Sequence, residues 1–219
     1  MLASIFFIYN RNIMKNKASY KERMIEIINL SYKLLCSKVE GKSITIFNEA
    51  SFQLQLGVIM KQVGLLYEFD LKDRFVIHLE TPKEIEPTIK SANGIARCDI
   101  EASLLRGDTC KAKALIELKY FHKSKNEAVT DNRFSVYKDL QNLEVYKSIE
   151  PSGTICCEIV CTDNENYKKP DTSSKINIGD NALSMKKIDY ANKTITLNNE
   201  HCFKWDSTDN GFHFLKIIF

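Results

Sequence analysis

Two residues of opposite charge, Glu117 and Lys119, interrupt an apolar stretch that otherwise has the composition of a buried strand. Side chains alternate across a strand, so both charged residues project from one face while Ile116, Leu118 and Tyr120 project from the other. Such a strand either lies half in solvent or contributes to a reactive site. Carboxylates bind hard divalent cations, and a nearby ammonium group can stabilise negative charge. The two side chains could therefore contribute to a reactive site.

A second carboxylate is expected to meet this pair across a hairpin. Strands predicted at 95–105 and 112–120 flank the turn sequence RGDT. A three-residue turn at 107–109 pairs Arg106 with Cys110 and sets Asp99 directly opposite Glu117. A two-residue turn would put the two carboxylates on opposite faces, so the prediction requires an odd loop length or a bulge.

In that register the hairpin has one polar and one apolar face. The polar face carries Arg97, Asp99, Glu101 and Ser103 alongside Lys119, Glu117, Leu115 and Lys113. The apolar face carries Ala96, Cys98, Ile100, Ala102 and Leu104 alongside Ala114, Ile116, Leu118 and Tyr120. Like charges opposed on a sheet destabilise it by up to ~1 kcal/mol, so two facing carboxylates make chemical sense when a divalent cation lies between them. The alternative is a solvated strand face, because a chain of this length contains on the order of one such Glu-x-Lys triplet by chance.

Three stretches have the apolar spacing of amphipathic helices. The first covers 19–39 and is followed by Gly41. The second begins at about Thr45 or Asn48 and ends at Val63, with Asn48 as its N-cap. Its apolar stripe is predicted to be Phe47, Ala50, Leu54 and Val58, and Gly64 to end it. The third covers 133–148, with Phe134, Tyr137, Leu140 and Leu143 on one side.

Further strands are predicted from β-branched and aromatic residues and from turn signals. They cover 65–69, 74–80, 154–161, 186–190, 194–198 and 212–219. We therefore expect an α/β (α+β) protein whose mixed central sheet is flanked by helices. Residues 1–165 would form the core with its N-terminal helix, and 166–219 a β-rich extension packed on the same domain.

The composition is that of a globular protein, with 219 residues, 44% hydrophobic and 27% charged residues. The net charge of +3 permits nucleic-acid binding without indicating it. Seven cysteines form no CxxC pair, and Cys157 and Cys161 alternate with Ile159 as core residues on a strand would. We therefore expect a reducing cytoplasm, with no membrane partner. The opening LASIFFIY is too short to span a bilayer, and we expect either a buried strand or a start at Met14.

The pattern resembles the PD-(D/E)XK nuclease superfamily, which has the restriction-endonuclease-like fold. The matching segments are RCDI with Asp99, IELKY with Glu117 and Lys119, the helix RFSVYKDLQNLEVY and the strand TICCEIVC. The match covers about residues 45–161. One departure is Cys98, where the family name has Pro, and the Pro carries no chemistry.

The resemblance implies a Mg²⁺-dependent endonuclease that hydrolyses DNA phosphodiester bonds, of a restriction or genome-defence kind. Asp99 and Glu117 would bind one or two Mg²⁺ ions, for which Mn²⁺ would substitute, with Glu49 and the Leu118 carbonyl as additional ligands. Lys119 would position or activate the attacking water. A catalytically inactive nucleic-acid-binding or protein-binding subunit is the alternative, and an unrelated α+β binding protein is a third possibility if the hairpin register is wrong.

The additional acidic ligand rests on the segment FNEASFQLQLG. There Glu49 and Gln53 share a helix face that the predicted apolar stripe leaves free. The alternative for Glu49 is a helix N-terminal acid favoured by the helix dipole. The resemblance favours the metal ligand.

Several cationic residues near the strand that carries Glu117 and Lys119, which we call the motif strand, are candidates for phosphate contacts. The alternative is that they are solvated surface charges. They are Arg97, Lys123, Lys125 and Arg133. DNA is therefore the expected partner. A double-strand cutter with one site per chain commonly acts as a homodimer, which is the expected assembly.

Overall fold

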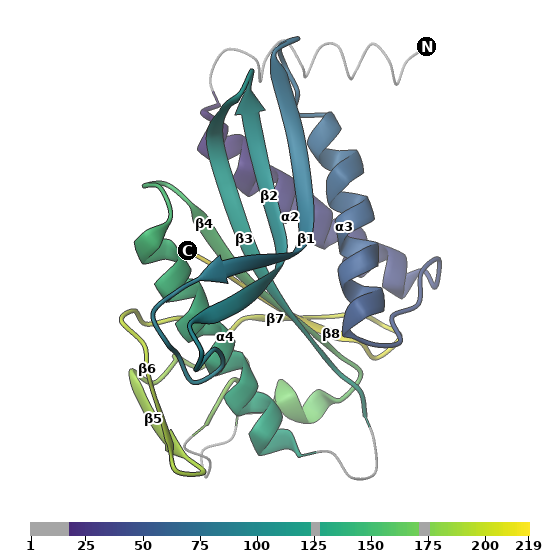
Figure 1. The fold of residues 1–219 in the computed structure, drawn as a ribbon. Helices are drawn as coiled ribbons and strands as arrows, with labels where there is room; N and C mark the ends of the chain where they lie inside the picture. Colours follow the sequence, from purple (N-terminus) through teal and green to yellow (C-terminus); the bar gives the residue numbers. More distant parts are fainter. Residues whose placement is uncertain (1–17, 124–127, 171–175) are drawn as a thin grey trace.

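The computed structural model describes residues 18–123, 128–170 and 176–219. Within them the chain is an α/β protein with three helices, a mixed six-stranded sheet and a small two-stranded hairpin (Figure 1). The helices are α2 (Tyr20–Glu40), α3 (Glu49–Leu65) and α4 (Val129–Ile149), with the short 3₁₀ helix η1 (Glu165–Tyr167). The strands of the large sheet are β1 (Asp73–Glu84), β2 (Ile95–Arg106), β3 (Thr109–Phe121), β4 (Ile155–Thr162), β7 (Trp205–Ser207) and β8 (His213–Ile218). The hairpin is β5 (Lys187–Tyr190) with β6 (Lys193–Thr196).

The sheet order is β1-β2-β3-β4-β8-β7, and only β3 and β4 among these strands run parallel. Helix α4 makes the crossover between these two strands, as a parallel connection requires. Figure 1 shows α4 on the opposite side of the sheet from α2. The apolar residues of α2 and α3 pack on one face of the sheet, and those of α4 on the other. The sheet therefore has two buried faces, each covered by helices.

Local sequence explains where the first two helices begin. Ser19 and Glu22 form a reciprocal capping box at α2, and Asn48 and Ser51 form one at α3. The predicted start of both helices is confirmed. Helix α3 does not end at Gly64 but continues to Leu65, so the strand predicted at 65–69 is wrong.

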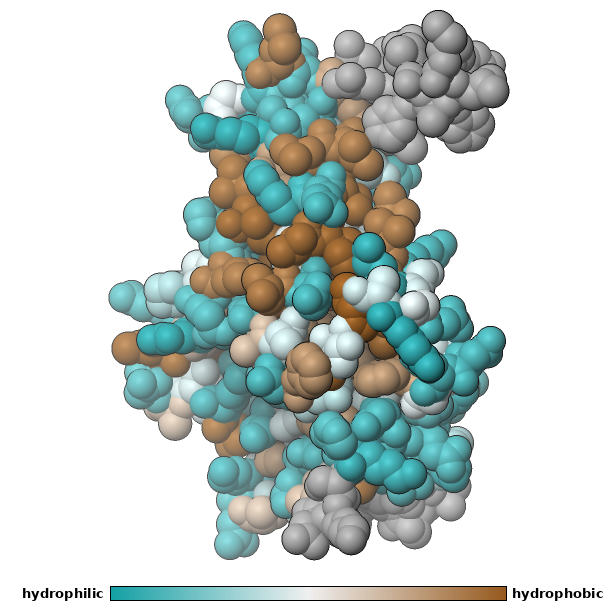
Figure 2. Space-filling model, turned by 90° about the vertical axis from the view of Figure 1, so that its right-hand side faces the viewer, coloured by the Kyte–Doolittle hydropathy of each residue, from teal (hydrophilic) through white to brown (hydrophobic). Residues whose placement is uncertain are grey.

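The predicted apolar stripe of α3 is also wrong. Phe47, Leu54 and Val58 are exposed, whereas the buried side is formed by Phe52, Leu56, Ile59, Met60 and Val63. This helix is apolar on nearly every side, so the 3.6-residue period fits more than one stripe and the packing decides between them. The exposed stripe and β1 line a shallow groove, formed by Leu54, Gly57, Val58, Lys61, Ile77 and Leu79. Figure 2 shows the corresponding face, with apolar side chains gathered above its centre.

The β2–β3 hairpin has the predicted register but not the predicted turn. Ile100 pairs with Ile116 and Leu104 with Ala112, as expected. The turn, however, has two residues, and Arg106 faces Thr109 rather than Cys110. A bulge between Leu104 and the turn restores the register, which is the second of the two predicted solutions.

Both hairpins of the meander are interrupted near Asp99. The β2–β3 ladder ends at the pair Ile100–Ile116. In the β1–β2 ladder, Asp99 and Glu80 are not paired, and Glu80 has a positive φ of 54°. Figure 1 shows β1 and β2 bending away from β3 at this level. As a result Ala96 and Cys98 pack with Leu143 and Tyr146 on the α4 side, not with Ile100 as predicted. The predicted backbone pairing of Asp99 with Glu117 and of Arg97 with Lys119 is therefore not made.

Residues 166–219 contribute more than an attached extension. Strand β8 pairs with β4, and β7 pairs with β8, so this segment completes the central sheet. The backbones of Cys156 and Phe219 also exchange two hydrogen bonds, of 2.9 and 3.0 Å. Strand β4 is consequently buried along its whole length.

All seven cysteines are free thiols, and Cys157 and Cys161 lie in the core as predicted. No helix within the described ranges is long and apolar enough to cross a membrane. The opening segment and Met14 lie outside the described residues.

Candidate active site

The carboxylate of Asp99 is held against β3 by a backbone hydrogen bond. The Leu118 N–H donates to Asp99 Oδ2 at 2.6 Å, taking the place of the ladder bond that is lost where β2 bends away. Asp99 is thereby placed beside Glu117, the neighbour of Leu118 along the chain. Gln53 of α3 secures the bend, since its Nε2 donates to Asp99 O at 2.7 Å and to Glu80 Oε1 at 2.9 Å. The Asp99 carboxylate is also close enough to Glu117 to help raise the pKa of Glu117, so the two predicted carboxyl groups belong to one site.

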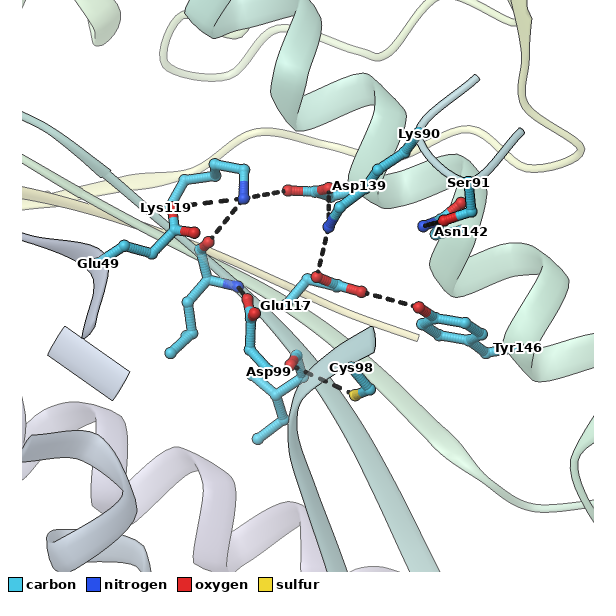
Figure 3. A network of polar contacts seen from close by, with 12 residues as sticks. Glu49, Lys90, Ser91, Cys98, Asp99, Glu117, Lys119, Asp139, Asn142 and Tyr146 are labelled. Carbon is cyan, nitrogen blue, oxygen red and sulfur yellow. Dashed lines mark hydrogen bonds and ion pairs between the residues drawn. The ribbon is translucent and has the colours of Figure 1, made fainter. Parts of the chain in front are cut away.

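Glu117 is completely buried, under α4. Tyr146 donates its hydroxyl to Glu117 Oε1 at 3.1 Å, and Lys90 Nζ lies 2.8 Å from Oε2 (Figure 3). Burial and the nearby Asp139 carboxylate raise the pKa of Glu117 to about 8, although Lys90 opposes the shift. Burial also raises the pKa of Asp99 to about 6, against the lowering effect of Lys119. Both carboxyl groups therefore hold protons more tightly than in water.

The ammonium group of Lys119 is fixed by three oxygen atoms. It lies 2.8 Å from Asp139 Oδ2, 2.9 Å from Leu118 O and 3.4 Å from Glu49 Oε2. Burial alone would lower the pKa of Lys119, but the carboxylates of Asp139 and Glu49 raise it above its ordinary value. Lys119 is thus a positively charged group whose position is set by α3, β3 and α4 together (Figure 3).

Glu49 lies at the first position of α3, where the Asn48 cap turns the chain toward the site. Its side chain is half-exposed, and its contact with the site is the one with Lys119. Glu49 therefore reaches the site through Lys119, and its role as a metal ligand stays a prediction. The Leu118 carbonyl, predicted as a further ligand, accepts a hydrogen bond from Lys119.

Asp139 of α4 joins the two lysines of the site. Its Oδ1 lies 2.6 Å from Lys90 Nζ, and its Oδ2 pairs with Lys119. The Asp139 side chain is 1% exposed, so the carboxylate end of both ion pairs is shielded from water. Lys90 and Lys119 thus form one network of ion pairs with the carboxylates of Glu117, Asp139 and Glu49.

A further carboxylate lies behind the network. Glu158 on β4 pairs in register with Glu117 on the parallel strand β3, and both are fully buried. Neither Glu158 oxygen has a hydrogen-bond partner among the described residues. Burial, together with Asp139, raises the pKa of Glu158 well above its ordinary value. Burial thus favours the neutral form of Glu158, because a buried charged carboxylate without a partner is costly.

The donor chemistry of Asp99 and Glu117 fits a hard cation. Their carboxylate oxygens lie on neighbouring strands, and Glu117 Oε2 already contacts a positive charge, the Lys90 ammonium. Within the described part of the chain, no group of three or more acidic, His or Cys side chains is gathered closely enough to hold a metal ion. Asp99 and Glu117 would be the carboxylate ligands of a Mg²⁺ ion, which commonly completes its shell with water.

The predicted phosphate contacts have different fates. Arg97 is exposed on β2, next to the bend, and Lys123 lies on the surface where its N–H donates to Asp163. Arg133 is buried, and its Nη2 donates to Asn166 O at 2.9 Å, so its environment does not favour a phosphate contact. Lys125 lies outside the described residues.

Sequence reasoning did not identify Lys90, Asp139, Tyr146 or Glu158. Lys90 lies in the loop between β1 and β2, and the others lie on α4 and β4. A signal was present for one of them. Glu158 interrupts a continuous apolar strand, as Glu117 does.

Comparisons of the chain with family models, with curated proteins and with solved structures found no match.

Proposed function

We propose that this chain is a Mg²⁺-dependent endonuclease that hydrolyses phosphodiester bonds of DNA, of a restriction or genome-defence kind. The observation that carries the proposal is the arrangement of three side chains. Asp99 is hydrogen-bonded to the backbone of the motif strand beside buried Glu117, and Lys119 extends from the same strand. Two carboxylates and one charged lysine supply a cation site and an adjacent positive charge.

The order of elements supports membership of the PD-(D/E)XK nuclease superfamily. Helix α3 is followed by the antiparallel meander β1–β2–β3, then by the crossing helix α4 and the parallel strand β4. The three signature side chains lie on β2 and β3, where the resemblance expects them.

The residues of the chain would share the catalytic work as follows. A bound Mg²⁺ would acidify a water molecule and polarise the phosphate. Asp99 and Glu117 would hold the cation, once both have lost their protons. Lys119 would orient the attacking water or stabilise charge on the phosphate, and Asp139 would keep its ammonium in place. Arg97 and Lys123 are proposed to contact the DNA backbone, and a homodimer would bring two sites to a duplex.

The test is a cleavage assay with Mg²⁺ or Mn²⁺ on duplex DNA, single-stranded DNA and RNA. We expect Asp99→Asn, Glu117→Gln and Lys119→Met each to lower the rate by at least about a hundredfold. Asp108→Asn is the matched control, because this exposed carboxylate lies in the turn of the same hairpin. Cleavage by the Glu117→Gln and Lys119→Met variants at the parent rate would exclude the proposal.

One observation favours a second function, a catalytically inactive subunit that binds nucleic acid or protein. Both oxygens of Glu117 already have partners, Lys90 and Tyr146, which compensate the carboxylate without a metal. Calorimetry separates the two functions. An inactive subunit would show no Mn²⁺ or Mg²⁺ binding that depends on Asp99, even with nucleic acid present.

A further inference from the structure

Lys90 places its positive charge on Glu117, one of the two carboxylates of the candidate metal site. Its ammonium is 2.8 Å from Glu117 Oε2 and 2.6 Å from Asp139 Oδ1, so it bridges β3 and α4. Figure 3 shows its side chain reaching into the site from a neighbouring loop. The side chain is 28% exposed, whereas that of Glu117 is 0% exposed, so Lys90 forms the outer side of the pair.

The backbone that carries Lys90 is fastened to α4. Ser91 Oγ accepts a hydrogen bond from Asn142 Nδ2 at 3.3 Å, and Ile89 N–H donates to Gln141 Oε1 at 3.4 Å. The Thr88 hydroxyl also donates to Asn142. The loop therefore keeps its place, and the ammonium can leave Glu117 by rotation of its long side chain alone.

Electrostatics makes Lys90 and a divalent cation competitors. An ammonium and a metal ion cannot both occupy the same face of Glu117 Oε2, and two positive charges in a buried site repel each other strongly. Asp139 does not require Lys90, because Lys119 pairs with its other oxygen. A cation that entered the site would therefore displace Lys90 without leaving Asp139 uncompensated.

We propose that Lys90 is a tethered counter-ion that occupies the cation position at Glu117 and must leave it when a divalent metal binds. The proposal rests on the proposed function, since it concerns the same site. It assigns to the β1–β2 loop the control of metal affinity. Lys90 keeps the buried Glu117 paired while no metal is bound, at the cost of weaker metal binding.

The test measures Mn²⁺ binding to the full chain by calorimetry, without nucleic acid. We expect Lys90→Met and Lys90→Gln to bind Mn²⁺ at least about tenfold more tightly than the parent, since the competing charge is gone. Lys138→Met is the matched control. Lys138 lies on α4 and its pKa is affected by Asp139, yet it has no ion pair with Glu117. Its loss should change the affinity by less than about threefold.

A second measurement uses the parent chain and requires no variant. Chemical methylation of lysines, quantified by mass spectrometry, should modify Lys90 several times faster with Mn²⁺ than without it, because its ammonium is released from the ion pair. Lys83, which is paired with Glu101 in the same sheet, should be modified at an unchanged rate.

The outcomes separate the two proposals. Unchanged or weaker Mn²⁺ affinity in folded Lys90 variants, or unchanged Lys90 labelling, would overturn the counter-ion role. If Glu117→Gln still abolished Mn²⁺ binding in that case, the proposed function would stand. Absence of Mn²⁺ binding in the parent and in both Lys90 variants would overturn both proposals.

Discussion

The ammonium of Lys119 lies 2.8 Å from Asp139 Oδ2, and this ion pair connects the motif strand to the helix that crosses the sheet after it. Lys119 lies two residues after Glu117 on the same strand. Its long side chain could rotate freely if no partner held the ammonium group. The buried carboxylate of Asp139 fixes its direction.

We predict that Asp139→Asn lowers the cleavage rate by about a hundredfold, the effect expected when a reacting group is misplaced. The reason is that asparagine cannot pair with the ammonium groups of Lys119 and Lys90. Steady-state kinetics should show the loss in kcat more than in KM. Asp131→Asn, on the exposed first turn of the same helix, is the control and should keep the parent kcat. A parent-like kcat in Asp139→Asn would contradict the positioning role.

The two raised pKa values make stability depend on pH. Asp99 and Glu117 ionise near pH 4 in an unfolded chain, but at about 6 and about 8 in the folded one. The folded protein therefore holds protons that the unfolded chain has lost, and the stability present below pH 4 is lost as the pH rises through 6 and 8. Each unit of pKa corresponds to about 1.4 kcal/mol.

We accordingly predict that the free energy of unfolding in EDTA falls between pH 5 and pH 9, and that Glu117→Gln flattens the curve. Urea denaturation at several pH values measures both. The same protons compete with a metal, so Mn²⁺ affinity should rise over this pH range. Identical slopes for the parent and Glu117→Gln would show that Glu117 is ionised throughout.

A glycine allows α3 to pack closely against β1. A Cβ on Gly64 would lie 2.1 Å from Phe75 Cδ1, and the Phe75 ring is completely buried. On Gly57, about two turns earlier in the same helix, a Cβ would meet Leu79 at an ordinary 3.5 Å. We predict that Gly64→Ala destabilises the protein by about 1–3 kcal/mol through overpacking. Gly57→Ala should stabilise it by up to about 1 kcal/mol through helix propensity. Thermal unfolding of the pair tests this, and equal melting temperatures would show that Phe75 can move aside.

Helix α2 is fastened to the sheet by a buried ion pair. Arg23 Nη1 lies 2.8 Å from Asp73 Oδ2 and also donates to Tyr67 O, while the Tyr20 hydroxyl donates to Asp73 Oδ1. Burial alone would raise the pKa of Asp73, but the hydrogen bonds of Arg23 and Tyr20 hold it below its ordinary value.

We predict that Asp73→Ala lowers the free energy of unfolding by about 3–5 kcal/mol, because it leaves the Arg23 charge buried without its partner. Asp108→Ala removes the exposed pair with Arg74 and should cost less than about 1 kcal/mol. Urea denaturation at neutral pH measures both. A similar small loss in both variants would mean that water reaches Arg23.

The sequence predicted those features of the site that depend on neighbouring residues. Alternation along β3 determines the faces of Glu117 and Lys119, and the turn residues place the hairpin at Gly107. The register itself depends on a bulge after Leu104, which compensates for the two-residue turn. The bend at Asp99 could not be predicted, because it arises from a positive φ in β1 and from packing on α4. Asp139 and Lys90 reach the site through tertiary contacts, which no local pattern encodes.

The same distinction explains the error in α3. Its sequence offers an apolar stripe at Leu54 and Val58 and another at Phe52 and Leu56, and periodicity alone does not choose between them. Asn48 gave the correct start because a cap depends on adjacent residues. Short-range chemistry was predictable, and the choice of buried face was not.

The pairing of β8 with β4 affects how the protein folds while it is being synthesised. Strand β4 carries Glu158, lies directly beside the motif strand, and takes as its second neighbour a segment that follows much later in the chain. While a ribosome extends the chain beyond β4, one edge of that apolar strand has no partner and can pair with another nascent chain. The central sheet closes only after residues 213–218 have been made, so the strand beside the site gains its second neighbour only once the long segment between β4 and β8 exists.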